Sequence, residues 1–113
     1  VSSWAWDHYG VDWVQLDAPR HLFLHSQESM QYLADTVGFE LRDTVYDSFA
    51  FQYWGSEQYL KDIPLNNERS YAVNPDKSIF SDHQIQNYAI RSKALNAEQQ
   101  GDQAAFYLHN KLA

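Results

Sequence analysis

The sequence predicts an α/β fold in which one helix leads directly into a strand and further helices follow. Residues 26–37 repeat apolar side chains with the period of a helix, and residues 40–47 alternate with the period of a strand. Residues 81–99 return to helical spacing. The chain has 113 residues, 44% of them hydrophobic, which suffices for one compact core and not for two ordinary domains. A helix followed at once by a strand is typical of an edge piece of an α/β sheet.

Residues 1–25 are expected to form an ordered loop, because their aromatic side chains follow no sustained period. Pro19 disfavours a helical conformation at Ala18. The alternation from Leu22 to His25 allows a short strand. The composition is not that of a linker, so a functional site is sought in and around this segment.

The helix at residues 26–37 has the clearest signals. Ser26 is a preferred N-cap, Glu28 lies in the first turn, where the helix dipole favours an acid, and Gly38 is a typical stop. Phe39 is expected to fold back on the last turn. The apolar face, with spacings i, i+3, i+4 and i+7, consists of Met30, Leu33, Ala34 and Val37.

The strand at residues 40–47 is expected to place Leu41 and Val45 on one face, together with the ring of Phe39. The other face then carries Arg42, Thr44 and Tyr46. A lone strand needs neighbours to pair its backbone groups, and the sequence offers no obvious one.

A second, short helix is expected over residues 57–62, because Ser56 could cap it and Pro64 would stop it. Residues 26–64 would then form a helix-strand-helix core. Residues 65–80 are polar and are expected to form a surface connection.

The C-terminal part, residues 81–113, is expected to form a helical tail. Ser81 and Gln84 form a capping box for a helix that runs to about Gln99. Its apolar face would consist of Ile85, Tyr88, Ala89, Ser92 and Leu95. A break at Gly101 and Asp102 would then restart a final helix through Phe106 and Leu112.

Composition argues against several classes of function. The net charge is −7 and the eight basic residues are scattered, so we expect no binding to nucleic acid or to an anionic membrane. No apolar run approaches the roughly 18 residues of a membrane span, and residues 1–10 lack the features of a signal peptide. The absence of cysteine excludes disulfides and fits a reducing interior, so the cytoplasm is the expected location. The start at Val1 suggests a piece of a longer polypeptide.

Asp17, Arg20 and His21 bracket Pro19 and form the main candidate site. A stiff loop that carries an acid, a guanidinium and an imidazole can orient a polar substrate and accept a proton near neutral pH. His21 is the candidate base. In the structural alternative, which the sequence slightly favours, Arg20 pairs with Asp17 to pin the loop and His21 makes a hydrogen bond with a carbonyl group.

Several other kinds of site find little support. His21 and His25 would share the face of a strand, but two histidines are too few for a metal site and no HExxH motif is present, so no metal is expected. The four glycines are isolated, so the usual loop for a nucleotide cofactor is missing. No carboxylate pair or G-x-S-x-G elbow indicates a glycosidase or a serine hydrolase.

Aromatic residues gather before and after the expected helix-strand unit. They are Trp4, Trp6, Tyr9, Trp13, Phe51, Tyr53 and Trp54. Such rings can stack on a sugar or another flat ligand, although packing in the core is the commoner outcome.

Three segments of the chain, in their order, resemble a known family. They are SSWAWDHYGVDWVQLDAPRHLFLHSQESMQYLADTVGFE, YDSFAFQYWGSEQYLKDIPL and KALNAEQQGDQAAFYL. Together they resemble the C-terminal half of class I S-adenosylmethionine-dependent methyltransferases, notably bacterial ones associated with surface polysaccharide biosynthesis. The resemblance covers nearly the whole chain. The helix with its terminal Gly-Phe is common to many methyltransferases, whereas LDAPRHLFLHS and FQYWGSEQYLKDIPL are much more specific to this subgroup.

The resemblance implies the C-terminal part of a Rossmann-like, doubly wound sheet of seven strands. This chain would supply the segment after the fifth strand, the next helix, the sixth strand and a tail, and as an isolated piece it would form a small α+β domain with a helical tail. The family's glycine-rich cofactor loop and acidic ribose contact lie upstream and are absent. S-adenosylmethionine is therefore expected in the full-length protein and not on this segment alone.

The first hypothesis is a methyltransferase segment that binds a sugar or glycan-related acceptor and is inactive alone. His21 would be the base, Arg20 would anchor an anionic group and Trp13 would shape the pocket. The full acceptor-binding set would be Tyr9, Trp13, Asp17, Arg20 and His25. A second hypothesis is a non-enzymatic module that binds carbohydrate or a partner protein. A third is self-association through unpaired strand edges and exposed aromatic faces.

Overall fold

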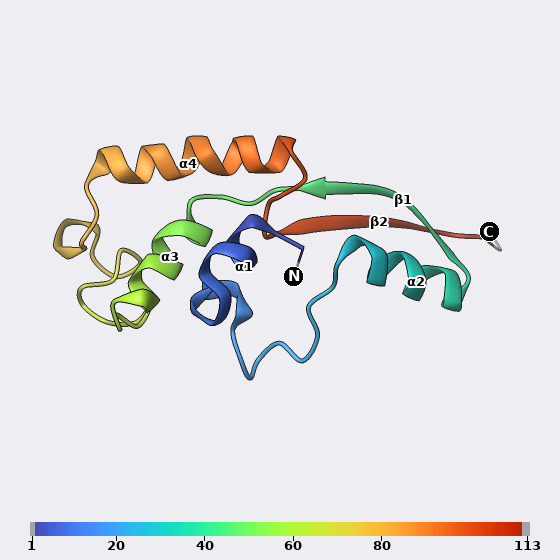
Figure 1. Ribbon diagram of the computed structural model, residues 1–113, viewed down its shortest axis with the longest axis horizontal. Helices are drawn as coiled ribbons and strands as arrows, with labels where there is room; N and C mark the ends of the chain where they lie inside the picture. The colour runs from blue at the N-terminus through green and yellow to red at the C-terminus, as the bar shows by residue number, and fades with distance from the viewer. Residues whose placement is uncertain (1, 112–113) are drawn as a thin grey trace.

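The computed structural model describes residues 2–111, which form a small mixed α+β domain. These residues contain four α-helices and one antiparallel sheet of two strands (Figure 1). The helices are α1 (Trp4–Tyr9), α2 (Gln27–Val37), α3 (Phe51–Leu60) and α4 (Asp82–Ala97). The strands are β1 (Phe39–Tyr46) and β2 (Ala104–Asn110). Three short 3-10 helices are η1 (Gly10–Asp12), η2 (Val14–Leu16) and η3 (Pro75–Lys77).

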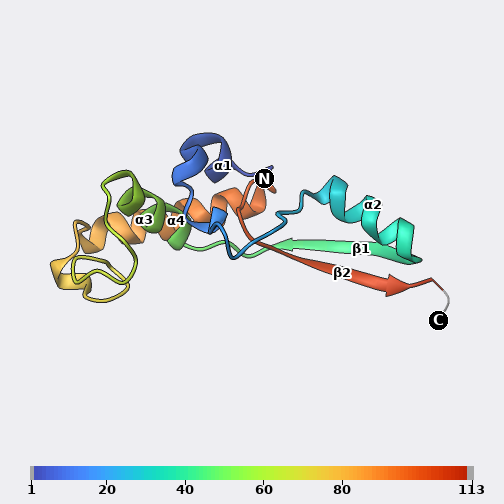
Figure 2. The same ribbon diagram turned by 90° about the horizontal axis from the view of Figure 1, so that it is seen from below.

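The domain is elongated, with principal extents of 53 × 29 × 23 Å. Helices α1, α3 and α4 gather at one end, whereas α2 lies beside the β1–β2 ribbon at the other (Figures 1 and 2). Because a two-stranded ribbon and one helix enclose little volume, several apolar side chains of this end stay exposed. They include Tyr32, Leu33, Val37, Val45, Tyr107 and Leu108.

Helix α2 confirms the expected start and stop. The Ser26 hydroxyl accepts the N–H of Ser29 at 3.1 Å, and the Ser29 hydroxyl accepts the N–H of Ser26 at 2.9 Å. Gly38 ends the helix with φ of 85°, a left-handed conformation that favours glycine. Of the expected apolar face, only Ala34 is buried, while Leu33 and Val37 are exposed. Phe39 follows this stop directly and begins β1.

Strand β1 matches the expected range within one residue, but its faces are not those expected. The register passes from Leu41 opposite Leu108 to Asp43 opposite Tyr107, so Arg42 is an extra residue in a β-bulge. An extra residue shifts the alternation by one position. The expectation that Val45 shares the face of Leu41 is therefore wrong, and Val45 is 43% exposed.

The expected final helix is wrong over the described residues, because residues 104–110 form strand β2, and Leu112 lies outside the described residues. This strand runs antiparallel to β1, with Phe39 opposite Asn110 and Tyr46 opposite Ala104. The N–H of Asp47 donates to the carbonyl of Gln103 at 3.1 Å and extends the ladder at one end. The neighbour that β1 needs thus lies in the C-terminal part of the chain.

The N-terminal segment is more helical than the loop expected over residues 1–25. Ser3 caps α1, because its hydroxyl accepts the N–H of Trp6 at 3.2 Å. The N–H of Trp4 donates to the carbonyl of Gln100 at 3.1 Å and ties α1 to the residues before β2. No strand forms between Leu22 and His25, so that expectation is also wrong.

Helix α3 begins at Phe51, earlier than the expected start after Ser56. Ser56 is fully buried inside the helix, and its hydroxyl accepts the N–H of Val14 at 3.0 Å instead of capping a helix. Gly55 allows this close approach, since a Cβ there would lie 2.8 Å from Cγ2 of Val14. Helix α3 therefore packs tightly on η2 and holds the N-terminal segment in place.

Helix α4 confirms the capping box, because the Ser81 hydroxyl accepts the N–H of Gln84 at 3.2 Å and Gln84 Oε1 accepts the N–H of Ser81 at 2.9 Å. Its contact with α3 is polar at the centre, since Gln52 Nε2 donates to the hydroxyl of Ser92 at 3.1 Å. Ala5 and Tyr9 of α1 form an apolar cluster with Trp13. The core thus combines a small apolar centre with buried hydrogen bonds.

Candidate functional site

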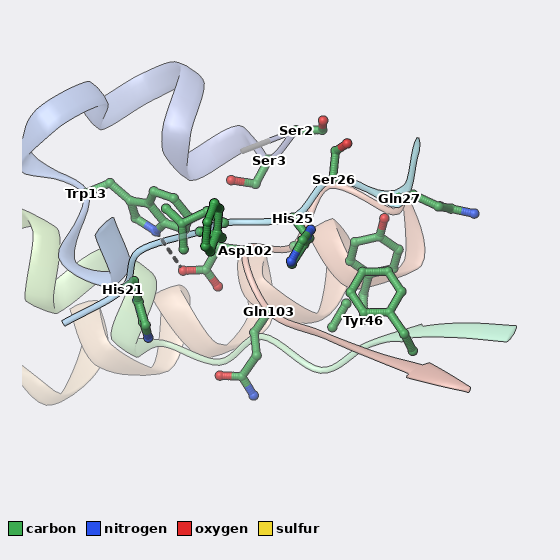
Figure 3. Close-up of a pocket in the computed structure, with 15 residues that line it drawn as sticks. Ser2, Ser3, Trp13, His21, His25, Ser26, Gln27, Tyr46, Asp102 and Gln103 are labelled. Atoms are coloured by element: carbon green, nitrogen blue, oxygen red, sulfur yellow. Dashed lines mark hydrogen bonds between the residues drawn. The ribbon is translucent and has the colours of Figure 1, made fainter. Parts of the chain in front are cut away.

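A cavity of about 280 Å³ lies between the segment at residues 21–27, the start of α1 and residues 101–106 (Figure 3). It is lined by residues from the N-terminal segment, from the end of β1 and from the start of β2. The side chains that can exchange protons or hydrogen bonds with a ligand include Trp13, His21, His25, Tyr46, Asp102 and Gln103. Residues distant in sequence thus meet around one space.

Asp102 is the central polar group of this cavity. Its Oδ2 accepts the indole N–H of Trp13 at 2.9 Å and the side-chain amide of Gln15 at 3.0 Å. Its Oδ1 is buried and has no hydrogen-bond partner in the described residues. Burial raises the pKa of the Asp102 carboxyl, and the hydrogen bond from Trp13 opposes this rise. The protein therefore bears a free-energy cost to keep this carboxylate ionised.

Trp13, a predicted acceptor-binding residue, is only 3% exposed. Its ring packs in the apolar cluster with Ala5 and Tyr9, so the ring face is not free to stack on a ligand. The indole N–H is its contribution to the cavity, because it holds Asp102 in place (Figure 3). Trp13 consequently acts on the site through the position of the carboxylate.

The two predicted histidines both line the cavity, although no strand brings them together. His21 Nδ1 lies 3.2 Å from the carbonyl oxygen of Gln15, and His25 Nδ1 lies 3.2 Å from the hydroxyl of Ser29. In both rings a fixed Nδ1 sets the orientation of the imidazole. Because Nδ1 is engaged, the Nε2 edge of each ring is the one that can contact a ligand.

Asp17 and Arg20 do not line this cavity. The Arg20 guanidinium pairs with Asp17 at 2.6 Å, and the Arg20 side chain is 77% exposed. Both lie at a smaller hollow of about 110 Å³, which His21 also borders. This arrangement is the structural alternative for the loop, in which the ion pair pins the turn and His21 contacts a carbonyl group.

Tyr9 also lies away from the cavity. Its ring is buried, and its hydroxyl donates to Oε1 of Glu57 at 2.9 Å. Burial, with a further contribution from Glu57, raises the pKa of the Tyr9 phenol. The contact joins α1 to α3, so Tyr9 has a structural position and not one beside a ligand.

The cavity residues that sequence reasoning missed include Phe23, Tyr46 and Asp102. Phe23 stands at the cavity with 81% of its surface exposed, which makes it the ring available for stacking. Asp102 looked like part of a helix break, because it follows Gly101. One sequence feature could have identified Asp102 as a candidate site residue. It has no basic residue within several positions on either side, so no local ion pair accounts for its charge.

The described residues were also compared with the needs of bound metals and cofactors. Residues 2–111 contain no group of three or more His, Asp or Glu side chains that could share a metal ion. Their four glycines lie in separate elements, and none stands between a strand and the start of a helix. Among the same residues, no helix combines the length and apolarity needed to cross a bilayer.

Asp102→Asn is expected to raise the free energy of unfolding by about 1 kcal/mol at neutral pH, because it removes a buried charge with an unpaired oxygen. The folded carboxyl has the higher pKa, so the folded state binds a proton more tightly than the unfolded state. The cost of ionisation is therefore complete above the folded pKa and vanishes as the pH falls below the ordinary value of 3.8.

Urea unfolding of both proteins from pH 7 to pH 3 measures this difference. We expect the advantage of Asp102→Asn to shrink as the pH falls through the raised pKa of the Asp102 carboxyl. Asp7→Asn is the matched control, because Asp7 is an exposed acid on α1 that does not line the cavity. A constant difference over the whole pH range would contradict the assigned cause.

Comparison of the chain with protein-family models, with curated proteins and with solved structures found no significant match. Functional conclusions therefore depend on the residues and on the geometry of the cavity.

Proposed function

We propose that this chain forms the acceptor-binding part of an S-adenosylmethionine-dependent methyltransferase that acts on a sugar or glycan-related acceptor. The observation that carries the proposal is the cavity, in which a buried carboxylate, two oriented imidazoles and an exposed aromatic ring face one space. Sugars bind to such sites, because hydroxyl groups need polar partners and the C–H faces of the ring pack on an aromatic side chain. The resemblance of LDAPRHLFLHS and FQYWGSEQYLKDIPL to this enzyme subgroup points the same way.

The two-stranded sheet supports the proposal that this chain is part of a larger sheet. Strand β2 has no charged residue, whereas β1 carries charged side chains and a bulge, the features with which proteins protect an outer edge. The outer edge of β2 over residues 104–109 is thus the better acceptor for another strand. Doubly wound folds often carry an antiparallel strand at the edge of a parallel sheet, which agrees with a Rossmann-like origin.

The cofactor would be held outside the described residues, and no catalytic step is assigned to it here. Within this chain, His21 remains the proposed base, because it lines the cavity and its Nδ1 is held by the carbonyl of Gln15. His25 is a proposed acceptor-binding residue on the side of α2. A cytoplasmic location belongs to the proposal and agrees with the absence of cysteine.

Calorimetric titration tests the proposal with two kinds of ligand. We expect simple methyl glycosides to bind in the millimolar range, and S-adenosylhomocysteine not to bind to this chain. Phe23→Ala should weaken glycoside binding, whereas Leu22→Ala, a neighbouring exposed residue that does not line the cavity, should not. Binding of S-adenosylhomocysteine together with indifference to every glycoside would overturn the assignment to the acceptor side.

A second proposal is self-association, which is favoured by exposed aromatic side chains in the loop before α2, on α2 and on β2. Phe23, Tyr32 and Tyr107 are 81%, 76% and 56% exposed, respectively, which is unusual for large aromatic side chains. Light scattering over a range of concentrations tests it, since a constant monomer mass would exclude association through these faces.

A further inference from the structure

The smaller hollow of about 110 Å³ adjoins the cavity, because His21 borders both. Figure 3 shows His21 and Gln27 at opposite ends of the cavity, so the hollow lies at its His21 end. The His21 side chain is exposed, and its Nδ1 is engaged by the carbonyl of Gln15. A ligand that leaves the cavity past the Nε2 edge of His21 would therefore reach the smaller hollow.

One side of this hollow is apolar and includes an aromatic ring. Val14, Phe51 and Leu65 line it, and the Phe51 side chain is partly exposed. The C–H face of a sugar packs on such a ring. The hollow thus offers a ligand the kind of contact that Phe23 offers in the cavity.

Phe51 also belongs to a row of aromatic rings. The ring centroids lie 5.9 Å apart between Phe49 and Phe51, 4.7 Å apart between Phe51 and Trp54, and 5.3 Å apart between Trp54 and Tyr71. Phe49 is 55% exposed, and the other three side chains are partly exposed. The row therefore extends the accessible aromatic surface beyond the hollow itself.

Asp17 and Arg20 form the polar side of the hollow. Nε and Nη2 of Arg20 both donate to Oδ1 of Asp17, at 3.0 and 2.6 Å, and these bonds do not use all the N–H donors of the guanidinium. The remaining donors belong to a side chain that is 77% exposed, so a ligand can reach them. Because Asp17 orients the guanidinium and balances its charge, the pair suits uncharged hydroxyl groups.

We infer that the smaller hollow is a second carbohydrate subsite, so that the acceptor is a glycan chain of two or more sugar units and not a single sugar. One unit occupies the cavity, and the next passes His21 and packs on Phe51, with Arg20 as a donor to its hydroxyl groups. The inference rests on the proposed acceptor-binding function and narrows its substrate class.

Nuclear magnetic resonance of the indole N–H groups tests the inference. The probes are the methyl glycosides of glucose and galactose, and the methyl glycosides of maltose, cellobiose and lactose. We expect the monosaccharides to shift the signal of Trp13, which lines the cavity. The disaccharides should also shift the signal of Trp54, because its ring packs on Phe51. The two signals are identified by their loss in Trp13→Phe and Trp54→Phe.

The variants compare disaccharide with monosaccharide affinity by calorimetry. We expect disaccharides to bind about tenfold more tightly, and Phe51→Leu, which keeps an apolar side chain but removes the ring, to abolish this ratio. Phe80→Leu is the matched control, because Phe80 is partly exposed and lines neither the cavity nor the hollow. If Phe51→Leu does not fold, Arg20→Ala changes an exposed side chain and should also lower the ratio.

The outcomes distinguish the second subsite from the acceptor-binding function. Disaccharides that bind no more tightly than monosaccharides and leave the Trp54 signal unchanged would overturn the second subsite, while a Trp13 shift would keep the acceptor-binding function. An unchanged affinity ratio in folded Phe51→Leu would also overturn the second subsite. Indole signals that respond to none of the sugars would overturn both.

Discussion

Gly101→Ala is expected to lower the free energy of unfolding by about 2 kcal/mol, because a methyl group has no room at this position. Gly101 is buried, and a Cβ there would lie 2.6 Å from the hydroxyl of Ser48 and would also contact the side-chain oxygen of Asn96. Neither group can move freely. Asn96 bonds to the backbone N–H and carbonyl of Ser48 at 3.0 and 2.9 Å, and the Ser48 hydroxyl accepts the N–H of Gln103 at 2.9 Å.

Denaturant unfolding followed by circular dichroism measures the effect. Gly38→Ala is the matched control, since the space around Gly38 is open but its φ of 85° is left-handed, and it should cost about 1 kcal/mol. Gly101→Ala should also shift the Trp13 indole signal, because residue 101 precedes Asp102. A cost no greater than that of Gly38→Ala would mean that the junction yields more easily than its contacts suggest.

Gln58→Ala is expected to lower the free energy of unfolding by about 3 kcal/mol, from a lost volume and an unpaired backbone donor. Gln58 lies on α3 and is fully buried. Its Oε1 accepts the N–H of Tyr71 at 2.9 Å, and its Nε2 donates to the hydroxyl of Ser70 at 3.1 Å. These bonds attach the connection between α3 and α4 to the core. Loss of the Gln58 side chain should therefore loosen residues 65–80 before the whole domain unfolds.

Hydrogen exchange at Tyr71 and Val73 measures that local opening, and thermal unfolding measures the global cost. Gln86→Ala on α4 is the matched control, because Gln86 is exposed and the change slightly favours a helix. An equally small effect of both substitutions would show that the buried amide contributes no more than a surface one.

The elements predicted well are those whose signals lie within the element. Ser26 with Gly38 bounds α2, and Ser81 with Gln84 starts α4, because capping depends on neighbours three residues away. Strand β2 has no such local signal, and its state is decided by pairing with β1, which is distant in sequence. Ser56 shows the opposite error, since a good cap residue is used inside α3 to receive the N–H of Val14.

The candidate site was predictable only in its N-terminal half. The segment around Pro19 identified His21 and His25 as cavity residues, because polar side chains beside a proline suggest an ordered functional loop. The same pattern predicted Arg20 as a site residue, but Arg20 forms an ion pair with the nearby Asp17 and does not line the cavity. Asp102 joins the site through tertiary contacts to Trp13 and Gln15, and such contacts leave no periodic trace in a sequence.

The bulge at Arg42 connects the sheet to the ligand-binding space. Tyr46, four residues further along β1, lines the cavity, whereas its neighbour Val45 faces solvent. In an unbroken ladder the side chains at 41, 43 and 45 would share one side, and Val45 would take the place of Tyr46. Deletion of Arg42 would make Leu41 and Asp43 consecutive positions of the ladder and leave Tyr46 opposite Ala104, so the phenol would stay at the cavity wall. The bulge therefore absorbs one surplus residue and lets Leu41 and Tyr46, five positions apart, lie on the same face of the strand.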